Sequence, residues 1–173
     1  PPYQPKKCLM HEKFVEPQEQ GPSDIAARQA WMAVLAETSS EKLKAAWNAI
    51  DEADKPAVEN LRTPERGLVM VRGRAAGIGE RFNLGEMTVT RSAVRMADGT
   101  TGVAYVGGRD ADHALIAATV DAMMQSETYR SLAEEAMVKP LEAGLKAAKT
   151  TSAQKTAATK VNFFTMVRSR GGK

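Results

Sequence analysis

The dipeptide Asp98-Gly99 constrains the fold more than any other feature of the chain. It separates two segments, 86–96 and 101–107, that are rich in β-branched residues and in alternating polar and apolar side chains. Asp-Gly between two such segments is the strongest short-range signal of a β-hairpin, because a tight type I′ turn needs positive φ at both central residues. The sequence therefore predicts an antiparallel hairpin over residues 86–107.

The predicted two-residue turn also sets which residues face each other across the hairpin. Met96 then faces Thr101, and Arg91 faces Val106. Because side chains alternate between the two faces of a strand, Arg91 and Arg95 lie on the same face, with an apolar centre on the other. Slipping the pairing by one residue would exchange the faces, so we expect a firm register.

Further strands are predicted on both sides of the hairpin. Residues 68–74 form a third strand, with turns at Gly77-Ile78-Gly79 and at Gly85. Residues 161–167 are apolar and β-rich and are interpreted as a fourth strand, although a buried helical continuation is the alternative. The expected sheet is an antiparallel meander of three to four strands.

Helical spacing dominates the rest of the chain, so we expect an α+β fold in which N- and C-terminal helices pack against the meander. Residues 1–22 are rich in proline and are interpreted as an extended arm that only a partner would order, while 23–173 form a single α+β domain. The expected helices cover 26–37 after the capping pair Ser23-Asp24, a stretch capped by Ser39-Ser40, 56–61, a stretch capped by Asp110, a stretch from Ser126 to Pro140, and Pro140 to about residue 160.

Composition excludes several classes of function. The chain has one cysteine, Cys8, and two histidines, His11 and His113, so no zinc, haem or iron–sulfur spacing exists and no metal site is expected. Its 24 basic and 21 acidic residues give a net charge of +3, too mild for a nucleic-acid footprint. No apolar run reaches the ~20 residues that span a bilayer. With no signal-peptide pattern either, we expect a cytoplasmic protein that binds neither membrane nor nucleic acid.

Arginines of the strand region are the candidate site residues. Arg81, Arg91, Arg95 and Arg109 would form a basic surface for a phosphorylated substrate or an acidic partner. The equally weighted alternative is a solvated face whose arginines pair with Glu80, Glu86 and Asp110.

Two other features bear on function. His113 could act as an acid or base, although a lone histidine near a helix start is more often a packing residue. The apolar cluster Phe163, Phe164 and Met166, like the arm, is typical of subunit association, or folds back on the same chain.

Several segments occur together in the order and at the approximate spacing of a known family. They are Gly79-Glu80-Arg81-Phe82, Thr90-Arg91-Ser92-Ala93-Val94-Arg95, Asp98-Gly99-Thr100, Gly108-Arg109-Asp110 with His113, and Phe163-Phe164-Thr165-Met166-Val167-Arg168. From about Arg28 to Arg168, the chain resembles the G-subunit family of the bacterial carbon–phosphorus lyase core complex.

This resemblance implies a non-autonomous subunit in phosphonate catabolism. Its partners would be the H, I and J subunits, with I the closest, and the accessory ABC-type K and L proteins. The implied reaction displaces adenine from ATP by a phosphonate and yields ribose 1-phosphonate 5-triphosphate. The family implies an iron–sulfur cluster on the J subunit and no cofactor on this chain. A mainly structural role is expected, and the alternative is a direct contribution of arginines to a shared phosphate or nucleotide site.

Overall fold

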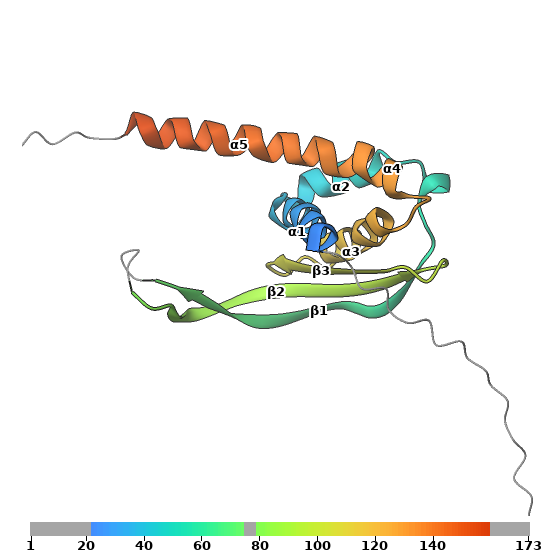
Figure 1. Cartoon of the computed structure of the whole chain (residues 1–173), viewed down its shortest axis with the longest axis horizontal. Coiled ribbons are helices and arrows are strands. Elements are labelled where there is room, and N and C mark those ends of the chain that lie inside the picture. Colours follow the sequence, from blue (N-terminus) through green and yellow to red (C-terminus); the bar gives the residue numbers. More distant parts are fainter. Residues whose placement is uncertain (1–21, 75–78, 160–173) are drawn as a thin grey trace, which may run out of the picture.

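The computed structural model describes residues 22–74 and 79–159 and confirms the α+β class (Figure 1). Three antiparallel strands form one sheet in the order β1-β2-β3, and the helices lie on one side of it (Figure 1). The elements are α1 (Pro22–Glu37), α2 (Ser40–Asn48), a short 3₁₀ turn (Glu52–Asp54), β1 (Val58–Gly73), β2 (Phe82–Met96), β3 (Thr101–Gly107), α3 (Ala111–Gln125), α4 (Arg130–Ala133) and α5 (Lys139–Ala158).

Strand β1 is far longer than the sequence pattern indicates. The helix predicted at 56–61 is wrong, because β1 begins at Val58 and pairs with β2 along almost its whole length. Pro64 breaks the strand pattern, yet it lies in one of the register shifts of β1, between Arg62 and Glu65. A bulge tolerates proline because the missing N–H removes no ladder hydrogen bond there. Gly85 is likewise within β2, paired with Val71, and is not the turn that was predicted.

The hairpin between β2 and β3 exists, but its predicted register is wrong by one residue. Met96 N donates to Thr100 O at 2.9 Å, and Gly99 N donates to Met96 O at 3.0 Å, so the loop has three residues rather than two. Gly99 has φ of 88°, the conformation that such a three-residue loop requires at its last position. The carboxylate of Asp98 stabilises this loop by accepting from Thr100 N at 2.8 Å and from the Ser126 hydroxyl at 2.9 Å.

The shifted register changes the neighbours of the arginines. Arg91 faces Tyr105 and Arg95 faces Thr101. The two arginines share a face, as predicted, but the residues of β3 exchange faces. The backbone of β3 turns its small and apolar residues to the core, so that the buried members of the strand are Gly102, Ala104 and Val106.

Helix α3 forms the centre of the core and is buried on nearly every side. It packs directly on the backbone of β3, because a Cβ atom at Gly102 would lie 2.0 Å from the carbonyl oxygen of Ala118. Asp110 caps this helix as predicted, accepting from His113 N at 3.0 Å. The core cluster includes Leu35, Leu43, Val94, Ala114, Ala118, Val120, Met123 and Met137.

The prediction that Pro140 ends a helix is wrong. Helical structure continues from α4 through a π-helical turn, Glu134–Val138, into α5. Proline has no N–H to donate within a helix, and the wider i→i+5 turn just before it accommodates that loss. The predicted fourth strand at 161–167, and all but the last residue of the predicted arm, lie outside the described residues.

Candidate subunit interface

Strands β1 and β2 continue well beyond the helical body as a two-stranded ribbon (Figure 1). The last pair between β2 and β3 is Val89 with Gly107, so residues 68–73 and 82–88, which pair with each other, lie beyond the end of β3. We call these residues the ribbon extension. A two-stranded ribbon without cover is at best marginally stable in water, so this segment needs contacts that the described residues do not supply.

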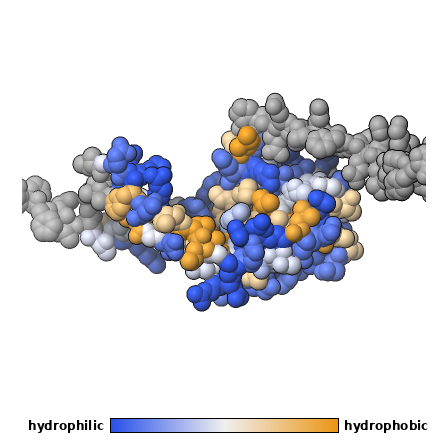
Figure 2. All heavy atoms as spheres, turned by 90° about the horizontal axis from the view of Figure 1, so that it is seen from below, coloured by the Kyte–Doolittle hydropathy of each residue, from blue (hydrophilic) through white to orange (hydrophobic). Residues whose placement is uncertain are grey.

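The ribbon extension carries large apolar side chains in the open. Figure 2 shows apolar residues along this narrow part of the molecule as well as on its broader part. Their exposed fractions run from 36% to 63%, and clustered exposed apolar residues mark an interaction surface. They are Leu68, Met70, Val71, Phe82, Leu84 and Met87.

The second half of α5 projects toward the same side as the ribbon extension (Figure 1). Every residue from Lys146 to Thr159 is exposed, and Lys149 Nζ reaches back to Glu37 at 2.6 Å. A lone helix of about this length is marginal in water, since isolated helices need roughly 12 to 15 residues or more. The ribbon extension and the end of α5 thus form two uncovered arms on one side of the molecule.

The four candidate arginines do not converge on one point. Arg91 Nε lies 2.7 Å from Glu65 Oε1, which Arg62 also contacts at 3.1 Å. Arg95 is exposed on the same face, four residues along the strand and therefore ~13 Å away. Arg81 precedes Arg91 by ten residues, which corresponds to roughly 30 Å of extended chain. A single phosphate group therefore cannot contact all of them.

Arg109 lies just after β3, where its carbonyl oxygen accepts from Arg66 Nε at 3.3 Å. Asp110, one of the acidic residues expected to pair with the arginines, is instead engaged with Lys44 Nζ at 3.2 Å and with the Ser40 hydroxyl. Two hydrogen bonds hold the pKa of Asp110 well below its ordinary value. The one from Ser40 has the larger effect and the one from the backbone N–H of His113 the next largest. Asp110 therefore has a capping and tethering role.

His113 is buried, with an exposed fraction of 4%. Its Nε2 lies 2.9 Å from the carbonyl oxygen of Leu35. A carbonyl oxygen only accepts, so Nε2–H is the donor and the ring joins α3 to α1. This geometry favours the packing interpretation of His113.

A buried charged network around Asp121 was not predicted from the sequence. This side chain is completely buried and accepts from Arg28 Nη2 at 2.7 Å and Nε at 3.2 Å, and from Trp31 Nε1 at 2.9 Å. It also accepts from the backbone N–H of Val103 at 2.9 Å. One feature of the sequence could have indicated this network. Asp121 stands inside an apolar helix, and a buried charge requires partners.

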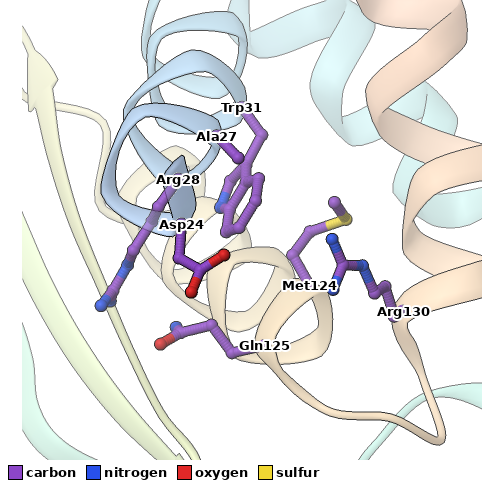
Figure 3. A pocket seen from close by; sticks show the side chains of 7 residues that line it. All are labelled: Asp24, Ala27, Arg28, Trp31, Met124, Gln125 and Arg130. Carbon is purple, nitrogen blue, oxygen red and sulfur yellow. The ribbon is translucent and has the colours of Figure 1, made fainter. Parts of the chain in front are cut away.

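A pocket of 180 Å³ adjoins this network (Figure 3). Trp31 and Met124 give it an apolar wall, while Arg28 and Arg130 lie on opposite sides (Figure 3). The charge of Arg28 is neutralised by Asp121, and Asp24 also lines the pocket. These opposing charges do not favour a phosphate here.

Within residues 22–74 and 79–159, two kinds of feature are absent. Within these ranges, no group of three or more His, Cys, Asp or Glu side chains could hold a metal ion. None of the helices described there is both long and apolar enough to cross a membrane.

Fold and surface together define a small α+β protein whose apolar ribbon extension is open to association. The family model described as "Phosphonate metabolism protein PhnG" matches residues 26–169. A relative from Rhizobium meliloti (strain 1021), named alpha-D-ribose 1-methylphosphonate 5-triphosphate synthase subunit PhnG, is 46% identical over 144 residues, which cover 83% of this chain and 90% of the relative. The chain belongs to the PhnG family of phosphonate metabolism proteins.

Proposed function

We propose that this chain is a non-autonomous, mainly structural subunit of a ribose 1-methylphosphonate 5-triphosphate synthase. In this assembly it joins the H, I and J subunits, lies closest to I, and supports the displacement of adenine from ATP by a phosphonate. The K and L proteins act as accessories in the cytoplasm. The chain itself carries no cofactor, and the J subunit carries the iron–sulfur cluster.

The uncovered ribbon extension is the observation that supports this role most strongly. Side chains such as Leu68 and Leu84 are exposed although they are as apolar as those of the core. A stable monomer rarely leaves such a cluster open, whereas a subunit interface buries it. Phe163, Phe164 and Met166, in the segment outside the described residues, remain predicted partner contacts.

Co-purification tests the structural role. The full chain, tagged, is co-expressed with the H, I and J subunits as the wild type and as the double variant Leu68→Asp/Met70→Asp. Charges introduced into an apolar interface oppose burial, so we expect the double variant to lose its partners. The matched control is Ile25→Asp, which changes an exposed apolar residue of α1, outside the ribbon extension. Retention of all partners by the double variant would contradict the proposal.

A second candidate role, in which arginines contact a shared phosphate, is favoured by one observation. Arg91 and Arg95 present guanidinium groups on the same face of β2. Arg91→Ala and Arg95→Ala are assayed separately in the assembled complex, by partner recovery and by adenine release from ATP with methylphosphonate. Intact assembly with weakened ATP affinity would support this role and overturn the purely structural one. Loss of assembly would do the opposite.

A further inference from the structure

Among the described residues, strand β3 has a free edge, and its backbone groups alternate in direction. Met96 N donates to Thr100 O, and Gly108 N donates to Thr88 O, so the even-numbered residues of this segment bond to β2. In an antiparallel ladder, the residues between them direct N–H and C=O to the other side. Thr101, Val103, Tyr105 and Gly107 therefore present their backbone groups to the free edge.

Helix α3 closes only the first part of this edge. Gln125 Nε2 donates to the carbonyl oxygen of Thr101 at 3.0 Å, and Val103 N donates to Asp121 Oδ2 at 2.9 Å. Asp121 is held in that position by Arg28 and by Trp31. The buried network thus acts as a side-chain cap on the edge, a common way to prevent unwanted pairing.

The remaining part of the edge stays open. The carbonyl of Val103, both backbone groups of Tyr105 and the N–H of Gly107 have no hydrogen-bond partner among the described residues. They form an array of alternating partial charges, acceptor, donor, acceptor, donor. The complementary array is the backbone of another strand.

An apolar groove runs beside this open edge. Its volume is 70 Å³, and α1 forms one wall through Met32, Leu35 and Ala36, while Ala117 of α3 contributes to it. The groove lies next to Val103–Val106, the same residues that border the open edge. Backbone groups along an edge and a pocket for one side chain beside it are the two elements of strand-addition recognition.

We propose that the edge Val103–Gly107 binds an extended strand of a partner subunit, which places one apolar side chain in the groove beneath α1. This inference rests on the proposed function, because the strand comes from another subunit of the assembly. The free edge of β1 is a poor alternative, since register shifts and Pro64 interrupt it. A second copy of β3 would have to bring its own α1 beside the first, because Met32, Leu35 and Ala36 of α1 line the groove next to the edge.

Amide hydrogen exchange measures the proposed contact without any substitution. The amides of Tyr105 and Gly107 exchange rapidly in the isolated full chain and at least about tenfold more slowly in the complex with the H, I and J subunits. The amide of Val103, already bonded to Asp121, serves as the internal reference. Unchanged exchange at Tyr105 in an intact complex overturns the strand inference and leaves the proposed function standing. Failure of the wild-type chain to join any of these subunits overturns both.

A pair of variants distinguishes the contribution of the Tyr105 backbone N–H to partner binding from that of its side chain. Tyr105→Pro removes an N–H that points away from β2, so the ladder within the chain keeps its hydrogen bonds. We expect partner affinity to fall about tenfold, while Tyr105→Val, which keeps the N–H, stays within about threefold of wild type. Equal losses in both variants would overturn the inference. Protection of Tyr105 in the isolated chain would also overturn it. The occupant would then be a second copy if the protection depends on concentration, or residues 161–167 of the same chain if it does not.

Discussion

The helical body and the ribbon extension both contain large aliphatic residues, but the body buries these side chains and the ribbon extension exposes them. In the body, Leu43 and Val94 are completely buried against α3. In the ribbon extension, Leu68 and Leu84 are more than half exposed. Burial of an aliphatic side chain stabilises a fold by about 1.5 to 3 kcal/mol, so only the first group stabilises the isolated chain substantially. The body therefore completes its own core, whereas the large apolar side chains of the ribbon extension stay exposed among the described residues.

A large effect is expected where the body buries a charge. Asp121→Ala leaves Arg28 without its carboxylate and Val103 N without an acceptor. Removing one member of such a pair costs about 3 to 5 kcal/mol, and partial exposure of Arg28 places the expected loss near the lower bound. The free energy of unfolding from urea titration measures it. Asp112→Ala, which disrupts an exposed ion pair with Lys44, is the control and should change stability little. Equal losses in both variants would show that the buried network does not stabilise the body.

The same chemical change in each region tests the comparison directly. Leu43→Ala opens a cavity in the core and should cost about 2 to 5 kcal/mol. Leu68→Ala removes a side chain that is 63% exposed and should change the stability of the isolated chain by less than about 0.5 kcal/mol. Thermal unfolding of the two variants beside wild type gives the difference. A large loss in Leu68→Ala would mean that the ribbon extension is already packed within the chain, which would remove the basis of the contrast.

A third, smaller effect is expected where α3 meets the backbone of β3. Gly102→Ala puts a Cβ against the backbone of Ala118, so the helix must shift, at a cost of about 1 to 3 kcal/mol. Gly107→Ala, in the same strand, meets nothing within 4 Å and is the matched control. Comparison of the two denaturation midpoints tests how closely the body is packed. If Gly102→Ala behaves like its control, the close contact of helix and strand does not restrict position 102 to glycine.

Local patterns predicted the elements of the body better than the contacts between them. The Asp-Gly hairpin and the Asp110 cap follow from neighbours in the sequence and are confirmed. The register was missed because Asp-Gly also suits a three-residue loop, whose last residue, here Gly99, has positive φ. The true extent of β1 was missed because its first half lacks alternation and contains Pro64, so that only pairing with β2 makes it a strand.

For the candidate site too, local properties were predicted correctly and long-range contacts were not. Arg91 and Arg95 were placed on one face correctly, since alternation along a strand is a local property. The Asp121 network was not anticipated, because Arg28 lies 93 residues away and periodicity carries no information on that contact. The roles assigned to Arg81, Arg91, Arg95, Arg109, Phe163, Phe164 and Met166 remain predictions.

The smallest expected effect concerns acid stability of the body. The hydrogen bond from Ser40 lowers the pKa of Asp110 in the folded state below its ordinary value of 3.8. A depressed carboxyl pKa stabilises the fold above the unfolded-state value, and this contribution is lost as the pH falls toward the folded-state value. Unfolding titrations between about pH 5 and about pH 2 should therefore show a shallower loss of stability in Asp110→Asn than in wild type. Ser40→Ala should lie between them, because it removes the main donor but keeps the carboxyl group. If Asp110→Asn retains the wild-type slope, other carboxyl groups determine the acid sensitivity, and the tie between α2 and the start of α3 contributes little to the stability of the body.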